Sequence, residues 1–119
     1  MSTTPEGKIQ SKIMELLVKQ GLFAFRVNNA PVWDRHLNSG YGSYRTQGKW
    51  AMPGLSDVIV VHNGLFIGCE IKTPTGKLSA DQILFKRRLE RVGGRYYVLR
   101  SVEDARLMLT ELNVVKGPS

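Results

Sequence analysis

A tight β-hairpin in the middle of the chain constrains the fold more than any other feature of the sequence. The β-branched run Val58–Val61 leads into His62-Asn63-Gly64, and the apolar run Leu65–Ile71 follows directly. An Asn-Gly pair between two apolar runs favours a tight turn, because both residues accept positive φ at little cost. The pattern therefore predicts two antiparallel strands joined at this turn.

Amphipathic segments on both sides of this hairpin predict three helices and two further strands. Apolar residues recur at helical spacing in each helical segment, next to residues that start or cap a helix. The expected helices cover about residues 6–20, 79–92 and 102–112, and the expected strands cover residues 22–27 and 95–100. In the second helix we expect Phe85, Leu89 and Val92 on the inner face. The resulting α-β-β-β-α-β-α order indicates an α/β fold with a mixed sheet flanked by helices.

Residues 28–53 show little periodicity. Turn-forming Gly, Asn and Ser residues alternate there with aromatic and cationic ones. A structureless stretch of this length is unusual inside a compact domain. Three alternatives remain open: the segment is functional, it is partly disordered, or it contains short strands.

Length and charge limit the classes of protein that the chain can represent. Its 119 residues predict one domain, spanning residues 1–119, with a single core. Seventeen Lys and Arg against ten Asp and Glu give a net charge of +7, which favours a polyanionic partner, with a merely soluble basic protein as the equal alternative. A single cysteine, Cys69, excludes an intrachain disulfide framework. No apolar run has the length of a membrane span, so we expect no membrane partner and a cytoplasmic location.

Charged residues interrupt the apolar pattern at the end of the second hairpin strand. Glu70 and Lys72 are two residues apart, so they project from one face of the strand, whereas Cys69 and Ile71 point to the opposite, buried face. Asp57 directly precedes the first hairpin strand. Because the hairpin turn lies near midway between Asp57 and Glu70, antiparallel pairing brings the two carboxylates together.

Two adjacent carboxylates repel each other unless a cation lies between them, and a hard divalent ion such as Mg²⁺ is the usual partner. Such an ion polarises a phosphate oxygen and lowers the pKa of a bound water. Lys72 would then hold the attacking water or neutralise charge on the phosphoryl oxygens. This is the chemistry of phosphodiester hydrolysis. The structural alternative is an exposed Glu70–Lys72 ion pair worth ~0.2–1 kcal/mol, with Asp57 as a turn residue.

Three motifs, in a fixed order, give this pattern a context. They are Pro53-Gly54-Leu55-Ser56-Asp57, Glu70-Ile71-Lys72 and Gly76-Lys77-Leu78-Ser79-Ala80-Asp81-Gln82. With these motifs the chain resembles the PD-(D/E)XK nuclease superfamily, and more narrowly its virus-type VRR-NUC branch, from the first helix to the last strand. Ser56 stands where the superfamily's name has Pro.

The resemblance implies a restriction-endonuclease-like core in which Asp57, Glu70 and the backbone carbonyl of Ile71 bind Mg²⁺ or Mn²⁺ and Lys72 assists catalysis. It also implies a homodimer that cuts branched DNA, such as four-way (Holliday) junctions or flaps, in a bacterial or phage-infected cell. Two alternatives stay open: a non-catalytic DNA-binding module that has kept the nuclease fold, and an RNA-cleaving relative.

Two further residues match the family. Gln82 matches the glutamine that faces the active site from the helix after the lysine strand. It also completes a capping box with Ser79, and the two roles do not exclude each other. Glu6 matches the acidic residue that the first helix supplies as an extra metal or water contact. Its alternative role is a first-turn residue favoured by the helix dipole.

Candidate DNA contacts are cationic. Lys77 is expected beside the active site, and Arg35, Arg45 and Lys49 belong to the region of residues 28–53. The aromatic residues of that region are candidates for stacking on bases or for a dimer interface.

Overall fold

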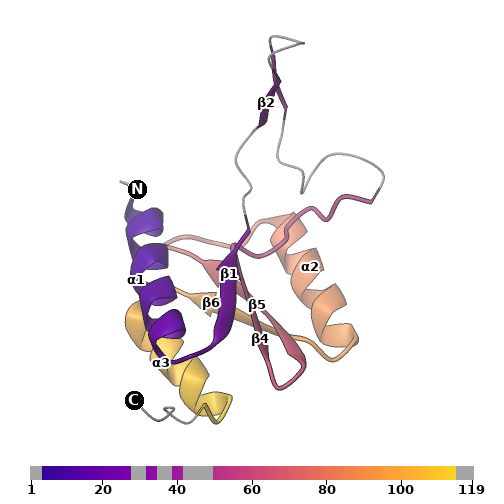
Figure 1. Cartoon of the computed structure of the whole chain (residues 1–119). Helices are drawn as coiled ribbons and strands as arrows, with labels where there is room; N and C mark the ends of the chain where they lie inside the picture. Colours follow the sequence, from indigo (N-terminus) through magenta and orange to yellow (C-terminus); the bar gives the residue numbers. More distant parts are fainter. Residues whose placement is uncertain (1–3, 28–31, 35–38, 42–49, 115–119) are drawn as a thin grey trace.

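The computed structural model describes residues 4–27, 32–34, 39–41 and 50–114. Within these ranges the chain forms a small α/β domain with a four-stranded mixed sheet, three helices and a separate two-stranded ribbon (Figure 1). The elements in chain order are α1 (Pro5–Lys19), β1 (Phe23–Arg26), β2 (Val32–Asp34), β3 (Ser39–Tyr41), β4 (Val58–His62), β5 (Leu65–Ile71), α2 (Ala80–Arg91), β6 (Arg95–Leu99) and α3 (Val102–Glu111).

The predicted hairpin forms the centre of the sheet. The strand order is β1-β4-β5-β6, with β4 antiparallel to both β1 and β5, and β5 parallel to β6. At the β4–β5 turn, Asn63 and Gly64 have φ values of 51° and 76°. The Asn-Gly turn and the mixed sheet with three helices are therefore confirmed. The predicted α-β-β-β-α-β-α order lacks the two short strands β2 and β3.

The helices divide between the two faces of the sheet. The helices α1 and α3 cover one face, and α2 lies on the other (Figure 1). The main core lies under α1 and α3, where alternate residues of β4 and β5 meet the inner faces of both helices. Its fully buried side chains include Ile13, Leu17, Val58, Val60, Ile67, Cys69 and Ile71.

Each of the three helices begins after a capping residue, as the sequence predicts for Ser79 and Ser101. Thr4 accepts a hydrogen bond from the Gly7 amide before α1, and Ser79 and Ser101 cap α2 and α3. The prediction of the inner faces is wrong for one residue. Val92 is 81% exposed because α2 ends at Arg91 and Val92 is its C-cap, whereas Phe85 is buried.

Of the alternatives for residues 28–53, the described part contains short strands. β2 and β3 pair as an antiparallel ribbon that extends away from the main sheet (Figure 1). Among the described residues, no helix combines the length and the apolar character that crossing a membrane requires.

Candidate active site

Asp57 and Glu70 lie opposite each other where β4 begins and β5 ends. Val58 pairs with Cys69, so one step further in the register Asp57 faces Glu70. Both belong to the sheet face that α2 covers, because their neighbours Val58 and Cys69 lie in the core on the other face. Only 2% of Glu70 and 9% of Asp57 is exposed. An exposed-strand ion pair is therefore wrong for Glu70.

The Asp57 carboxylate is held by the backbone of β5. Its Oδ2 accepts a hydrogen bond from the Ile71 amide at 3.0 Å. The next amide, that of Lys72, donates to Leu99 on β6 at 3.1 Å, so the Ile71 amide points the opposite way, towards β4. The Asp57 side chain thus extends the β4–β5 hydrogen-bond ladder by one bond before β4 begins at Val58. A residue that only formed a turn would not make this bond.

Two close approaches fix the segment that leads to Asp57. A Cβ at Gly54 would collide with the carbonyl of Asp81 and lie 2.8 Å from the amide nitrogen of Gln82. The turn therefore lies directly on the first turn of α2. At the next contact, the hydroxyl of Ser56 occupies the space above Gly68, where a Cβ would lie 2.5 Å from Oγ. Only glycine permits either approach.

Gln82 completes the predicted capping box and also contacts Glu70. Its Oε1 accepts a hydrogen bond from the Ser79 amide at 2.8 Å, and its own backbone amide donates to the Ser79 hydroxyl oxygen at 3.2 Å, which completes the capping box. Its Nε2 donates to Glu70 Oε1 at 2.5 Å. One side chain therefore joins the start of α2 to a buried carboxylate of β5.

Lys72 begins the loop that follows β5, and Lys77 lies within it. Lys72 is half-buried and continues the alternation of β5 on the side of Glu70, whereas Lys77 is exposed. The prediction that Glu70 and Lys72 share one face is consistent with this register.

Among the described residues, Glu6 is not grouped with the carboxylate pair. Glu6 lies in the first turn of α1, the position that the helix dipole favours for an acid. Within the described ranges no three His, Cys, Asp or Glu side chains are grouped to hold a metal ion, so Glu6 does not form such a group with Asp57 and Glu70. Arg35, Arg45 and Lys49 lie outside the described residues.

Burial and charge both act on the residue next to Glu70. Burial raises the pKa of the Cys69 thiol from 9.0 to about 12, and the negative charge of Glu70 adds to this rise. The core face of β5 thus keeps a neutral thiol directly behind the charged face.

The donor set can be compared with the needs of a metal ion. Asp57 and Glu70 supply carboxylate oxygens. The carbonyl and the amide of one strand residue point to the same side, and the Ile71 amide donates to Asp57, so the Ile71 carbonyl also points towards the side of β4. These are the hard oxygen donors that Mg²⁺ and Mn²⁺ prefer, and Mg²⁺ fills its remaining positions with water. The residues therefore fit a hard divalent cation.

The sequence did not single out Arg100, whose side chain bonds to the loop after β5. No motif identifies it, because the contacts span more than twenty residues. Its position at the end of the predicted strand of residues 95–100, directly before Ser101, was the available signal.

Comparisons with known proteins do not assign the chain to a family. No model of a known protein family matches the sequence, and a search of curated proteins found no match either.

Proposed function

We propose that the chain is a Mg²⁺- or Mn²⁺-dependent endonuclease with a restriction-endonuclease-like core, similar to the VRR-NUC branch, that hydrolyses phosphodiester bonds in branched DNA. One observation supports this proposal above the others. Asp57 and Glu70 are buried side by side at the end of the sheet where Lys72 leaves β5. Burying two acids together is costly for a fold, and such pairs are enriched at functional sites.

Asp57, Glu70 and the Ile71 carbonyl would hold the ion. When bound, the ion supplies Lewis acidity at the scissile phosphodiester group. The protein's own residues position the two carboxylates and neutralise negative charge on the phosphate. Gln82 fixes the rotamer of Glu70 through its hydrogen bond of 2.5 Å, and the Ile71 amide fixes that of Asp57.

Lys72 completes the site from the same face of β5. Its ammonium group stabilises negative charge on the phosphoryl oxygens or holds the attacking water in line with the phosphorus. Lys77, exposed in the adjoining loop, is a candidate contact to a flanking phosphate. The net charge of +7 supports a polyanionic substrate.

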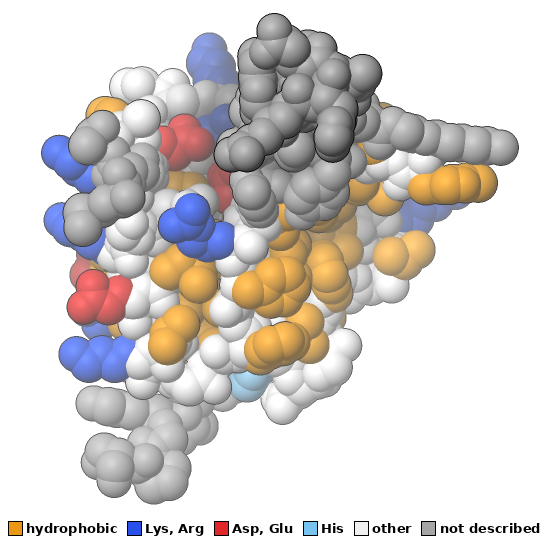
Figure 2. Space-filling model, turned by 45° about the horizontal axis from the view of Figure 1, so that its top comes forward, with side chains coloured by type: hydrophobic (Ala, Val, Ile, Leu, Met, Phe, Trp, Pro, Cys, Tyr) orange, Lys and Arg blue, Asp and Glu red, His pale blue; other side chains and the backbone are white. Residues whose placement is uncertain are grey.

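The proposal includes a homodimer, and the uncovered part of the sheet supports it. Phe23 and Phe25 of the edge strand β1 are 66% and 42% exposed, with ring centroids 5.7 Å apart. Phe66 on β5 is 39% exposed and shares their face. In Figure 2 hydrophobic side chains gather in one area of the molecule. An open apolar cavity of about 590 Å³ adjoins this face and is lined by Met52, Leu55, Phe66, Phe85, Arg88, Leu89 and Val92.

An exposed apolar face of this kind is typical of an interface, because monomeric proteins rarely leave large contiguous apolar patches open to water. In a symmetric dimer the same patch is used by both copies. We therefore assign the dimer interface to the face that contains Phe23, Phe25 and Phe66.

A cleavage assay tests the nuclease. The parent protein with Mg²⁺ is incubated with four-way, flap and linear DNA, and with an RNA of the same sequence. Asp57→Asn keeps an acceptor for the Ile71 amide, and Lys72→Ala removes the ammonium group; we expect each to lower cleavage by at least about 100-fold. Lys8→Ala, on the exposed side of α1, is the control.

The outcomes separate the alternatives. Variants that cut as well as the parent would refute the assignment of the site. Salt-sensitive DNA binding by the parent without cleavage would indicate the non-catalytic module, and cleavage of RNA alone would indicate the RNA-cleaving relative.

A further inference from the structure

Arg100 holds the loop that leaves β5 from the neighbouring end of β6. Its Nη1 atom donates to the carbonyl oxygens of Thr73 and Gly76 at 2.6 Å each, and it lies 3.4 Å from that of Pro74. The Gly76 amide closes the same turn by donating to the Thr73 carbonyl at 3.1 Å. One guanidinium group is therefore hydrogen-bonded to the carbonyl groups of three loop residues.

This loop connects two parts of the candidate site. Lys72 begins it, and Ser79, whose hydroxyl and amide both bond to Gln82, ends it. The Lys72 side chain runs along the loop, since a Cβ on Gly76 would lie 3.4 Å from Lys72 Cδ. The path of the loop thus determines where the Lys72 ammonium group lies relative to Glu70.

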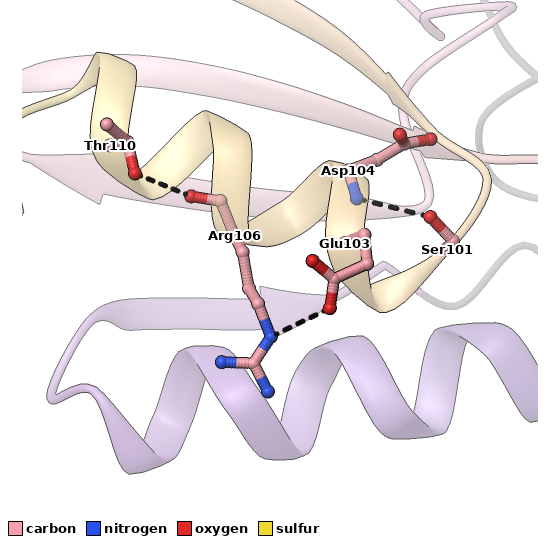
Figure 3. Close-up of polar contacts among 5 residues, drawn as sticks. All are labelled: Ser101, Glu103, Asp104, Arg106 and Thr110. Carbon is pink, nitrogen blue, oxygen red and sulfur yellow. Dashed lines mark hydrogen bonds and ion pairs between the residues drawn. The ribbon is translucent and has the colours of Figure 1, made fainter.

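Arg100 is itself held in place from the other side. Asp104 accepts a hydrogen bond from the Arg100 amide on Oδ2 at 2.8 Å. The Asp104 amide in turn donates to the Ser101 hydroxyl at 3.2 Å, a bond drawn in the close-up of the α3 start (Figure 3). Just before Arg100, the Leu99 carbonyl accepts from the Lys72 amide at 3.1 Å. The backbone of Arg100 is therefore fixed both to α3 and to the end of β5.

We propose that Arg100 is a positioning residue for the reaction: it fixes the loop of residues 72–79 and so keeps Lys72 at a set distance from Glu70. This inference rests on the proposed nuclease function. Arginine suits the role because its planar group holds several donors in fixed directions, whereas the ammonium group of lysine offers only a freely rotating point charge. Arg100 acts through the loop and through Lys72.

The experiment compares Arg100→Lys and Arg100→Ala with Arg106→Lys as the matched control. Arg106 is an exposed arginine of α3 whose Nε lies 3.3 Å from Glu103 (Figure 3). We expect Arg100→Lys to lower kcat by between about 10- and 100-fold, with KM changed by less than about threefold, because a misplaced catalytic group affects turnover more than binding. Arg106→Lys leaves both unchanged.

Chemical rescue separates positioning from general stability. Guanidinium ion at non-denaturing concentration restores a part of the kcat of Arg100→Ala, and it restores nothing to Lys72→Ala. Arg100→Lys with the kcat of the parent, or Arg100→Ala without rescue, would overturn the proposal.

A second measurement does not depend on activity. Amide hydrogen exchange at Gly76 speeds up at least about tenfold in Arg100→Lys relative to the parent and to Arg106→Lys, since the turn loses its tether. Unchanged exchange overturns the proposal even if Arg100→Ala fails to fold. If the parent protein cuts no nucleic acid, the nuclease function fails, while the exchange data still decide whether Arg100 fixes the loop.

Discussion

Gly54 and Gly21 allow a controlled test of how the site is assembled. Both residues have a φ of +80°, so alanine at either position is forced into the same strained backbone region. Their surroundings differ. A Cβ at Gly21 meets nothing within 4 Å, whereas at Gly54 it would lie 2.8 Å from the Gln82 amide nitrogen and closer still to the carbonyl of Asp81.

The expected magnitudes follow from this difference. Left-handed backbone costs an alanine about 1–2 kcal/mol, and the stiffer unfolded chain returns about 0.4–1 kcal/mol, so Gly21→Ala loses about 1 kcal/mol of unfolding free energy. Gly54→Ala has the same balance plus about 1–3 kcal/mol for overpacking against helix backbone, which cannot rotate away. We therefore expect Gly54→Ala to lose about 1–3 kcal/mol more than Gly21→Ala.

Urea unfolding followed by far-UV circular dichroism measures both losses, with the slope m checked for two-state behaviour. Cleavage is then measured on the folded fraction. Because the Gly54 turn positions Asp57, Gly54→Ala also lowers cleavage, and Gly21→Ala does not. Equal losses of stability in the two variants, or parent-like cleavage by Gly54→Ala, would refute the close approach of this turn to α2.

Three further predictions concern single side chains. Gln82→Glu keeps a capping-box acceptor but cannot donate to Glu70, and it puts a second carboxylate beside that buried acid, so we expect it to lower both the cleavage rate and the unfolding temperature. Gln82→Ala adds no charge, and we expect it to lower cleavage and to lose about 1 kcal/mol of cap stability. Cys69 keeps its proton in the folded state up to about pH 12, and the unfolded chain loses it near pH 9.0. Unfolding free energy therefore falls above that pH by up to about 1.4 kcal/mol per unit, and Cys69→Ala shows a smaller fall in urea unfolding between about pH 8 and pH 10.5. Finally, we expect Phe23→Asp to convert the proposed dimer to a monomer in sedimentation velocity. The control is Val18→Asp, because the Val18 side chain on α1 is 59% exposed but lies outside the proposed interface, and we expect it to leave the dimer intact.

The elements that the sequence predicted are those whose signals are local. The Asn63-Gly64 turn needs only two adjacent residues, and the Ser79 and Ser101 caps need only the residues three positions ahead. The β2–β3 ribbon was not identified, because its strands are only three residues long and no periodicity emerges over that length.

For the site, the hairpin symmetry was enough to place Asp57 opposite Glu70. The degree of burial was not predictable, because Glu70 is covered by α2, which follows it in the chain and packs on the sheet face opposite α1 and α3. The contribution of Arg100 depends on contacts with backbone carbonyl groups 24 to 27 residues away. Because every residue has a backbone carbonyl, the sequence does not indicate which of them Arg100 contacts.

The two hydrogen bonds of Gln82 have a consequence for how the protein can be studied. Its amide oxygen is bound to the backbone of Ser79 and its amide nitrogen to Glu70, so a ligand that draws the Glu70 carboxylate away also strains the bond at the helix start. The nuclear magnetic resonance signal of the Ser79 amide is then an intrinsic sensor of occupancy at Glu70. It allows ligand titrations without a substrate, a label or a change to any residue of the site.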